Sequence, residues 1–309
     1  MSWLIPKIAY LTQPNFHALA NSQGKIQLLT LGFSHYVELA RWSLQLKGIK
    51  FVEHAYVPGQ HILPVLAARV CGEAASLSDS SYLKPVGDRK KADEDPSKEA
   101  KRAKSSRSTA VPLAIIPNSN EALADSWSIA KYSGLAPIDN DFKILLDAKL
   151  GPLSRQLVYV YILKQKSWFS ELCSENQPWW WRMLWNLFLG DYTLKLLGKI
   201  FRPYDIDAVN KCRSDLKDVV LQCDGILRSR KGNFIAGDSL GVADIALCSL
   251  MAPMVMPDGY ANGMFFKNFK KLMDMDESLR KEVEYWRTTE AGIYTLKIYN
   301  EYRSMTPSG

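Results

Sequence analysis

Apolar and polar positions follow two different periods over residues 25–57. Residues 25–31 alternate as in a β-strand, and an apolar stripe at helical spacing then runs from Val37 to Leu46. The stripe ends at a lysine followed by Gly48, which is a common way for a helix to end. Strand-like alternation returns over residues 49–57. The pattern therefore predicts a strand, helix, strand unit.

A second group of short elements follows further along the chain. Residues 110–116 predict a strand with a proline near its start, and the turn-forming residues 117–120 lead to a short strand over 121–124. An aspartate and a serine then open a helix over 125–132. From about residue 142 to residue 303 the pattern is helical, without a convincing strand. A small α/β domain followed by a larger all-α domain is expected.

We accordingly divide the chain into an N-terminal extension (1–24), an α/β domain (25–137) and an all-α domain (138–309). A length of 309 residues fits two domains, and a hydrophobic content of 47% excludes an intrinsically disordered chain. Residues 88–108 differ from the rest, because eight basic and five acidic residues leave too few apolar groups to order the segment. We interpret this segment as a solvated insertion, with a docking arm for an acidic partner as the alternative.

The net charge of +7 would suit a nucleic-acid partner if it were concentrated on one face. The insertion alone contributes +3, so we expect no nucleic-acid partner. The cysteines show no spacing typical of zinc sites or disulfide frameworks, and the first residues lack the pattern of a signal peptide. A cytoplasmic protein without a metal or a nucleotide cofactor is expected. The cysteines are Cys71, Cys173, Cys212, Cys223 and Cys248.

Four motifs occur in the same order as in the glutathione transferase superfamily, which the chain resembles. They are Ser34 to Ile49, which looks like the segment that opens the first helix in the Ser-type and Cys-type classes; Val111-Pro112-Leu113, similar to the cis-proline strand; Asp125-Ser126 with Ile129 and Tyr132; and Phe234 to Asp238 with Val242 to Ile245, similar to a helix-capping segment. The chain departs from the family at His35, where proline is usual, at Gly241, where serine or threonine is usual, and in the insertion.

The resemblance implies a thioredoxin-like N-terminal domain of class α+β, followed by an all-α helical-bundle C-terminal domain. It implies a cytoplasmic, homodimeric detoxification enzyme that uses glutathione as co-substrate and conjugates its thiolate to a small hydrophobic electrophile. A non-catalytic binding or assembly module of the same fold is the alternative. The residues expected to bind glutathione are Phe33, Ser34, Tyr36, Val111, Pro112, Asp125 and Ser126. For the basic residue that would meet the glycine carboxylate, His61 and Lys84 are only weak candidates.

Ser34 is the expected catalytic residue, because its hydroxyl lies where a strand ends and the positive end of a helix dipole begins. Lowering a thiol pKa by roughly two units requires about 2.7 kcal/mol of selective thiolate stabilisation. One charge-assisted hydrogen bond of about 1.5 to 3 kcal/mol and a dipole contribution of about 0.3 to 1 kcal/mol suffice. Serine cannot form a mixed disulfide, so conjugation or glutathione peroxidase-like activity is favoured over thiol transfer. A plain helix cap is the alternative role for Ser34, and also for Asp125 and Ser126.

Residues 178–201 form the most apolar part of the chain, and their charges argue against a simple membrane span. Three interpretations stay open: core or intersubunit packing, part of an acceptor pocket, and attachment to a membrane surface. Packing is favoured, and membrane contact is not expected. The possible acceptor-pocket residues are His35, Tyr159, Tyr161 and Trp168.

Overall fold

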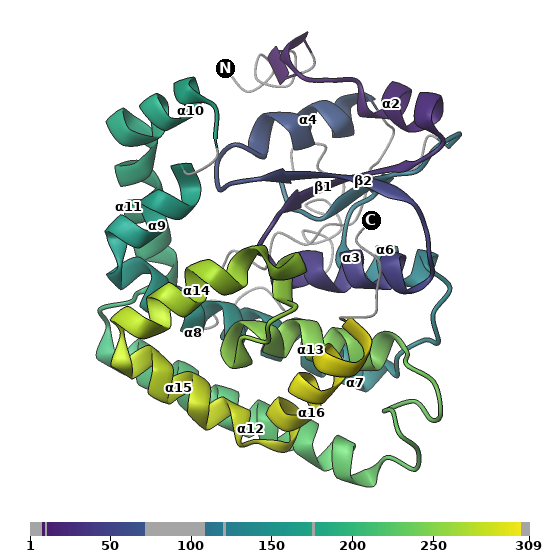
Figure 1. The fold of residues 1–309 in the computed structure, drawn as a ribbon, viewed down its shortest axis with the longest axis vertical. Helices are drawn as coiled ribbons and strands as arrows, with labels where there is room; N and C mark the ends of the chain where they lie inside the picture. Colours follow the sequence, from purple (N-terminus) through teal and green to yellow (C-terminus); the bar gives the residue numbers. More distant parts are fainter. Residues whose placement is uncertain (1–7, 10, 72–108, 120–121, 175–176, 304–309) are drawn as a thin grey trace, which may run out of the picture. The chain divides into compact units, whose positions relative to one another are not determined.

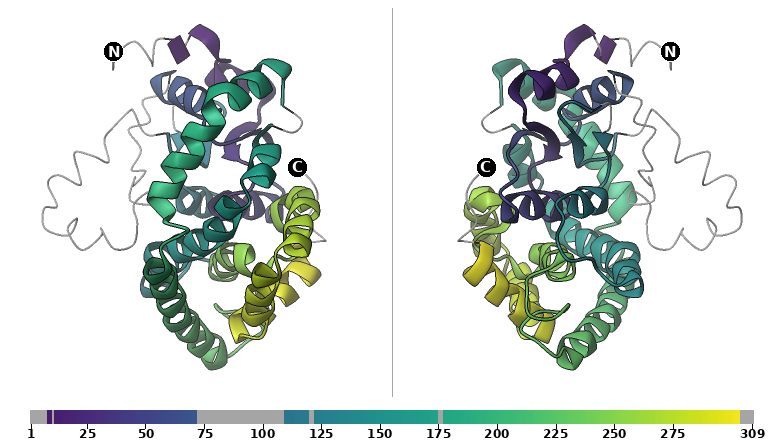
Figure 2. Two further views of the ribbon diagram at one scale, coloured as in Figure 1. Left: turned by 90° about the vertical axis from the view of Figure 1, so that its left-hand side faces the viewer. Right: turned by 90° about the vertical axis from the view of Figure 1, so that its right-hand side faces the viewer.

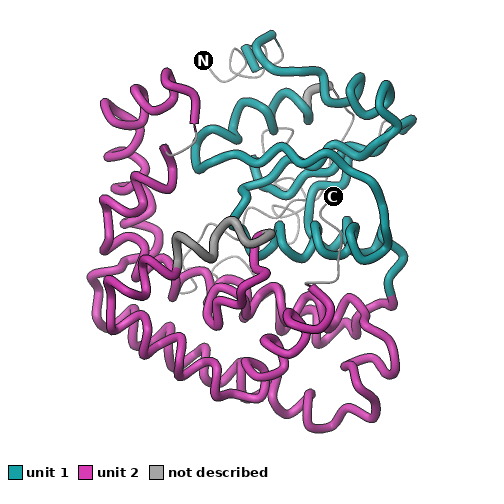
Figure 3. Tube along the Cα trace, in the orientation of Figure 1, with its two compact units in different colours: residues 1–135, 307–309 teal, residues 136–306 magenta. Residues whose placement is uncertain are grey.

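The computed structural model describes residues 8, 9, 11–71, 109–119, 122–174 and 177–303. These residues divide into two compact units, with the boundary between Leu135 and Ala136 (Figure 3). The segment 88–108, for which an insertion is predicted, lies outside the described residues.

Four strands form the sheet of the first unit, in the order β2-β1-β3-β4. Figure 1 labels the neighbours β1 and β2. β1 (Ile26–Leu31) pairs in parallel with β2 (Phe51–Tyr56) and antiparallel with β3 (Leu113–Ile115). β4 (Ala122–Leu123) adds to β3 in antiparallel orientation. Two parallel neighbours need a crossover, which α3 (His35–Leu46) supplies, so the predicted strand, helix, strand unit is confirmed.

Helices cover both faces of this sheet. The two-residue period of a strand sends Leu28 and Leu29 of β1 to opposite faces. Leu29 packs with α2 (Phe16–Gln23) and α4 (Ile62–Cys71), while Leu28 packs with α3 and α6 (Ser126–Tyr132). Because α2 contributes two buried side chains to this core, it belongs to the first unit rather than to a separate extension.

The second unit is helical. In chain order its α-helices are α7 (Asn140–Ile144), α8 (Gly151–Lys164), α9 (Lys166–Ser174), α10 (Trp179–Leu184), α11 (Gly190–Phe201), α12 (Ile206–Ser229), α13 (Val242–Val255), α14 (Met264–Met275), α15 (Glu277–Arg287) and α16 (Glu290–Ile298). Turns of π-helix lie at Leu145–Leu150, Trp185–Leu189 and Tyr299–Arg303, and a short 3-10 helix lies at Tyr260–Gly263. The described residues of this unit form no strand longer than one isolated bridge, which fits the predicted all-α domain.

Helix α13 is the central helix of the second unit and is buried along its whole length. It packs against α8, α15 and α16. Its first turn is fixed by the fully buried Asp244, whose carboxylate accepts hydrogen bonds from Gly241 N (2.9 Å), Ile235 N (2.8 Å) and the Tyr294 hydroxyl (2.6 Å). The helix-capping segment predicted from the sequence is therefore present, with Gly241 as the N-cap residue.

Replacing Asp244 with alanine is expected to lower the free energy of unfolding by about 2 to 4 kcal/mol, because three donors lose their acceptor inside the core. Urea-induced unfolding at pH 7 measures the change. Asp218→Ala, at an exposed position of α12, is the control and should stay within about 0.5 kcal/mol of the wild type. Equal losses for both variants would contradict the role assigned to Asp244.

Candidate functional site

The turn between β1 and α3 presents Ser34 at the N-terminus of a 12-residue helix. Ser34 has extended backbone angles (φ −73°, ψ 129°), and its carbonyl accepts the first helical hydrogen bond, from Glu38 N (2.9 Å). Its own N–H donates to Leu31 O (2.9 Å), which closes the turn. The hydroxyl makes no capping hydrogen bond to the helix. The structure thus leaves the partly exposed Ser34 hydroxyl without the plain cap role that was the alternative to catalysis.

A buried arginine of α3, Arg41, stabilises this turn by hydrogen bonding to its backbone. Arg41 Nη2 donates to the carbonyl of Gly32 (3.2 Å), two residues before Ser34. The same guanidinium donates to Glu38 (2.6 Å) and forms two hydrogen bonds with Glu53 (2.6 and 2.8 Å). Burial lowers the pKa of Arg41, but the hydrogen bonds and charges of the two glutamates outweigh it and keep the pKa above its usual value. Arg41 is therefore a permanent cation that ties the turn to α3 and β2.

The strand register brings the three predicted glutathione-binding segments to one edge of the sheet. Leu29 of β1 lies opposite Leu113 of β3, so the end of β1 that leads to Ser34 adjoins the start of β3 at Val111. Ala114 of β3 lies opposite Leu123 of β4, which places the start of α6 beside the same end of β3. The segments around Ser34, Val111 and Asp125 therefore meet on one side of the first unit.

At the start of β3, the Val111–Pro112 peptide bond is cis, as the resemblance predicts. Pro112 is buried, and the partly buried Val111 packs against the core that α2 and α4 share with the sheet. Arg69 of α4 donates from Nη2 to Ala110 O (3.3 Å), directly before Val111. A second buried arginine thus holds backbone next to the predicted site.

Asp125 is the N-cap of α6. Its carboxylate accepts hydrogen bonds from Ser128 N (2.8 Å) and Ser128 Oγ (2.7 Å). The structural role weighed as an alternative for Asp125 is therefore realised, although each carboxylate oxygen can still accept a further donor. Ser126 is buried, as is Ile129, whereas Tyr132 is exposed.

The aromatic residues around Ser34 lie partly inside the first unit. Tyr36 is buried, and its ring centroid lies 4.5 Å from that of His35, which is also buried. Phe33 is only partly buried. His35 therefore replaces the expected proline without leaving an exposed imidazole at the start of α3.

His61 does not offer the cation that a carboxylate ligand would need. Burial lowers its pKa to about 4, partly offset by a hydrogen bond with the backbone of Val57, so the ring is neutral at pH 7. Its Nδ1 has no hydrogen-bond partner among the described residues. The other weak candidate, Lys84, lies outside the described residues.

Because the His61 pKa is about 4 in the folded state and about 6.5 when unfolded, the unfolded chain binds this proton first as the pH falls. We expect this residue to lower the free energy of unfolding progressively between pH 6.5 and 4, by about 1 to 3 kcal/mol in all. In His61→Gln that loss should be absent. Urea unfolding of both proteins at several pH values measures the difference, and parallel pH profiles would contradict the assignment.

The predicted acceptor-pocket residues of the second unit make packing and polar contacts in the structure. Tyr161 is buried, and its hydroxyl donates to Glu282 (2.7 Å) and accepts from Arg213 (2.8 Å). Trp168 is buried, and the ring of Tyr159 stacks on Phe201 with centroids 4.2 Å apart. These contacts are structural, and an acceptor role for the three residues stays a prediction.

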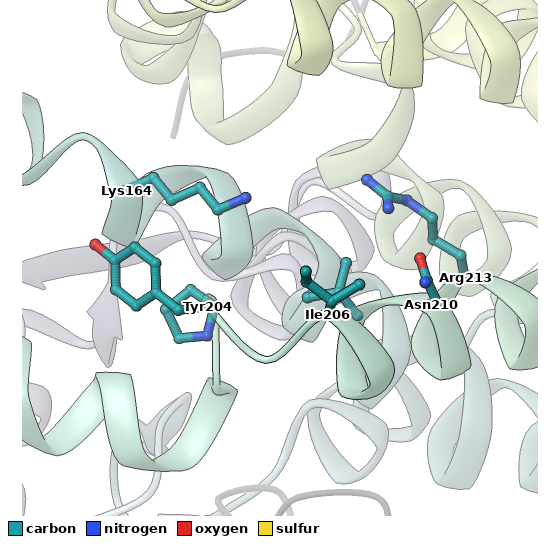
Figure 4. A pocket seen from close by; sticks show the side chains of 7 residues that line it. Lys164, Tyr204, Ile206, Asn210 and Arg213 are labelled. Carbon is teal, nitrogen blue, oxygen red and sulfur yellow. The ribbon is translucent and has the colours of Figure 1, made fainter.

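A shallow pocket of about 240 Å³ lies elsewhere in the second unit (Figure 4). Of its lining residues, Lys164 and Arg213 lie on either side of Ile206 in Figure 4. None of the predicted acceptor-pocket residues is among its lining residues, which are Lys164, Pro203, Tyr204, Ile206, Val209, Asn210 and Arg213.

The four described cysteine side chains are buried and unpaired. Burial raises the pKa of each thiol, to about 12 for Cys212 and Cys223 and further for Cys173 and Cys248. None of the four provides a reactive thiolate at neutral pH. Among the described residues no cluster of histidine, cysteine and acidic side chains could hold a metal ion.

Sequence reasoning missed Arg41 and Arg69, the two buried arginines behind the site. The available signal was their position on otherwise apolar helix faces, together with the i, i+3 spacing of Glu38 and Arg41. The spacing of Glu38 and Arg41 is also that of an ordinary surface ion pair. Only the fold reveals that the charges of Glu38 and Arg41 are both buried.

Comparisons with known proteins identify the fold. No family model matches the chain, and no curated protein matches it in sequence. A glutathione S-transferase of Ceriporiopsis subvermispora, solved with glutathione, superposes with a TM-score of 0.51 at 14% identity, covering 92% of this chain and 100% of its own. Glutathione transferases of Phanerochaete chrysosporium (15% identity, 87% and 97% covered, TM-score 0.46) and Burkholderia graminis (13%, 93% and 98%, 0.41) are also similar. The similarity to the Ceriporiopsis subvermispora structure shows that the chain has the glutathione transferase fold. The predicted fold class is therefore confirmed.

Proposed function

We propose that this protein binds glutathione at the edge of the first unit's sheet and conjugates its thiolate to small electrophilic, hydrophobic molecules. The observation that carries the proposal is the Ser34 hydroxyl, which lies at the N-terminus of α3 and makes no hydrogen bond to that helix. A hydroxyl left free at the positive end of a helix can donate to an anion. The fungal relative of the same fold was solved with glutathione, which fits this ligand.

In this mechanism Ser34 Oγ–H donates to the glutathione sulfur and stabilises the thiolate, whose proton passes to solvent. The sulfur electron pair then forms a bond to an electrophilic carbon, and the leaving group departs with the electrons of its own bond. The thiolate thus replaces the leaving group, and Ser34 keeps its proton throughout. The stabilisation required, about 2.7 kcal/mol for roughly two pKa units, is within reach of one charge-assisted hydrogen bond and the helix dipole.

The other two segments at the same sheet edge would hold the peptide part of glutathione. We assign the backbone beside Val111 and Pro112 to pairing with the extended peptide, since β3 starts there. The Asp125 carboxylate, which can accept one more donor on each oxygen, would receive the γ-glutamyl ammonium group, and Ser126 would meet the carboxylate beside it. Phe33 and Tyr36 would flank the thiol.

A second candidate function is a binding or assembly module of the same fold without catalysis. The neutral His61 favours it, because this unit then lacks one of the cations that could meet the glycine carboxylate. A protein of this fold that binds glutathione only weakly would act by binding or assembling with another molecule instead of by catalysis.

Calorimetric titration of the full chain with glutathione, followed by a conjugation assay with an activated chloronitroarene, separates the candidates. Binding together with turnover supports the transferase. Binding without turnover, or no binding at millimolar glutathione, overturns the transferase and supports the non-catalytic module. The same two measurements on Ser34→Ala test the role of its hydroxyl. Ser22→Ala is the matched control for that variant, because Ser22 is an exposed serine of the same unit whose hydroxyl donates to the backbone of its own helix.

A further inference from the structure

Large apolar side chains are exposed along α10, the following π turn and α11. These helices are on the left of Figure 1, and the left panel of Figure 2 faces them. The exposed fractions of these side chains range from 37% to 76%. Core packing therefore does not account for this face, and the intersubunit packing given with it as one interpretation stays a prediction. The residues, which we call the apolar ridge, are Trp179, Trp180, Met183, Leu184, Leu187, Phe188, Tyr192 and Leu196.

The opposite face of the same helices is fixed in the second unit. The indole of Trp181 is buried and donates to Cys173 O (3.1 Å) in α9. Trp185 is also buried, and its ring centroid lies 6.1 Å from that of Phe169. Because these anchors hold the helix axis and its rotation, the apolar ridge cannot turn inward without breaking them.

The spacing of the ridge makes it one continuous surface. Positions 179, 183 and 187 form one i, i+4 row, and positions 180, 184, 188, 192 and 196 form a second row beside it. Rows of this spacing drift around an α-helix of 3.6 residues per turn. The wider π turn at Trp185–Leu189 offsets part of this drift, and the two rows remain neighbours along the element.

Basic side chains flank this ridge. Arg182, Lys195 and Lys199 are exposed, against one exposed acidic residue, Asp191. Lys195 and Lys199 follow each other at i, i+4 and lie next to the ridge positions Tyr192 and Leu196. The element therefore combines an exposed aromatic and aliphatic face with a net positive border.

We propose that the apolar ridge docks on the surface of an anionic phospholipid membrane. Tryptophan and tyrosine favour the boundary between acyl chains and headgroups, and lysine and arginine beside them attract anionic lipid. Aromatic residues, methionine and arginine are also enriched in protein interfaces, but lysine is depleted there, and two of the three flanking cations are lysines. Docking requires no spanning segment, and no helix of the described chain is both long and apolar enough to cross a bilayer.

Sedimentation of the full-length protein with sucrose-loaded vesicles tests this inference, using phosphatidylcholine alone and phosphatidylcholine mixed with phosphatidylserine. We expect at least tenfold tighter binding to the phosphatidylserine vesicles at low salt, and a smaller difference at high salt. Leu187→Ser with Phe188→Ser should weaken binding at least tenfold, because two side chains that would enter the lipid become polar. Lys195→Glu with Lys199→Glu should weaken binding to the anionic vesicles alone.

Matched variants elsewhere in the same unit control for general effects. Leu221→Ser replaces an equally exposed leucine of α12, and Lys231→Glu with Lys297→Glu makes the same change in net charge away from the ridge. Unchanged binding in these controls supports the ridge as the membrane contact. Absence of vesicle binding, or equal losses in the controls, overturns the proposal. It is also overturned if light scattering shows a lipid-free oligomer that Leu187→Ser with Phe188→Ser converts to monomers, since a second copy then covers the ridge.

Discussion

Replacing Ser34 with alanine is expected to lower the conjugation rate at pH 7 about 10- to 100-fold while leaving the stability of the protein nearly unchanged. The loss of rate follows from the hydrogen bond that the hydroxyl donates to the thiolate, worth about 1.5 to 3 kcal/mol. The stability should hold because the hydroxyl makes no capping hydrogen bond to α3. A serine that served only as a cap would show the opposite result, with about 0.5 to 2 kcal/mol of stability lost.

The pH dependence of kcat/KM shows whether the lost rate reflects the thiol. With the hydroxyl absent, the apparent pKa of bound glutathione should rise by about one to two units, so the rate of Ser34→Ala should recover at high pH. Ser34→Thr keeps a hydroxyl and should retain most of the activity, and Ser22→Ala should behave as the wild type. A Ser34→Ala enzyme with lower activity but an unshifted pH profile would refute thiolate stabilisation by this hydroxyl.

Local signals in the sequence were enough to predict the sheet of the first unit and its helices α3 and α6, but not α2 or α4. The strand, helix, strand unit was predictable because the apolar period changes from two to 3.6 and back within one short stretch. The end of α3 was predictable from Gly48, which has the left-handed φ of 64° that favours glycine. The predicted strand over 110–116 is shorter in the structure, Leu113–Ile115, because only these residues face a partner in β1.

The roles of aromatic residues in the second unit could not be predicted in the same way. Helix α8 is buried on several sides, so helical spacing does not show whether Tyr161 meets a cavity or a polar partner such as Glu282. In residues 179–201 apolar residues occupy both faces, and the sequence does not indicate that Trp181 and Trp185 face inward while Phe188 faces solvent. Such assignments depend on which other helices pack nearby.

The role of Arg41 at the site could not be predicted from the sequence. Arg41 lies on α3, whereas its partner Glu53 lies on β2, and its other contact is with the backbone carbonyl of Gly32. Arg41 and Glu38 are both fully shielded from solvent. Removing one partner of a buried ion pair leaves the other charge without compensation, at a cost of about 3 to 5 kcal/mol. We therefore expect Arg41→Met to lower the free energy of unfolding by about that amount.

Urea unfolding at pH 7 measures this loss. Arg228→Met is the control, because Arg228 is exposed and its ion pair with Glu290 is long, at 3.9 Å. The control should change stability by less than about 1 kcal/mol. Glu38→Leu combined with Arg41→Leu should recover part of the loss, since a buried pair replaced by apolar side chains leaves a smaller uncompensated charge. If Arg41→Met matched the control, the buried network would not be what holds the Gly32 to Ser34 turn, and the rigid presentation of the Ser34 hydroxyl would need another source.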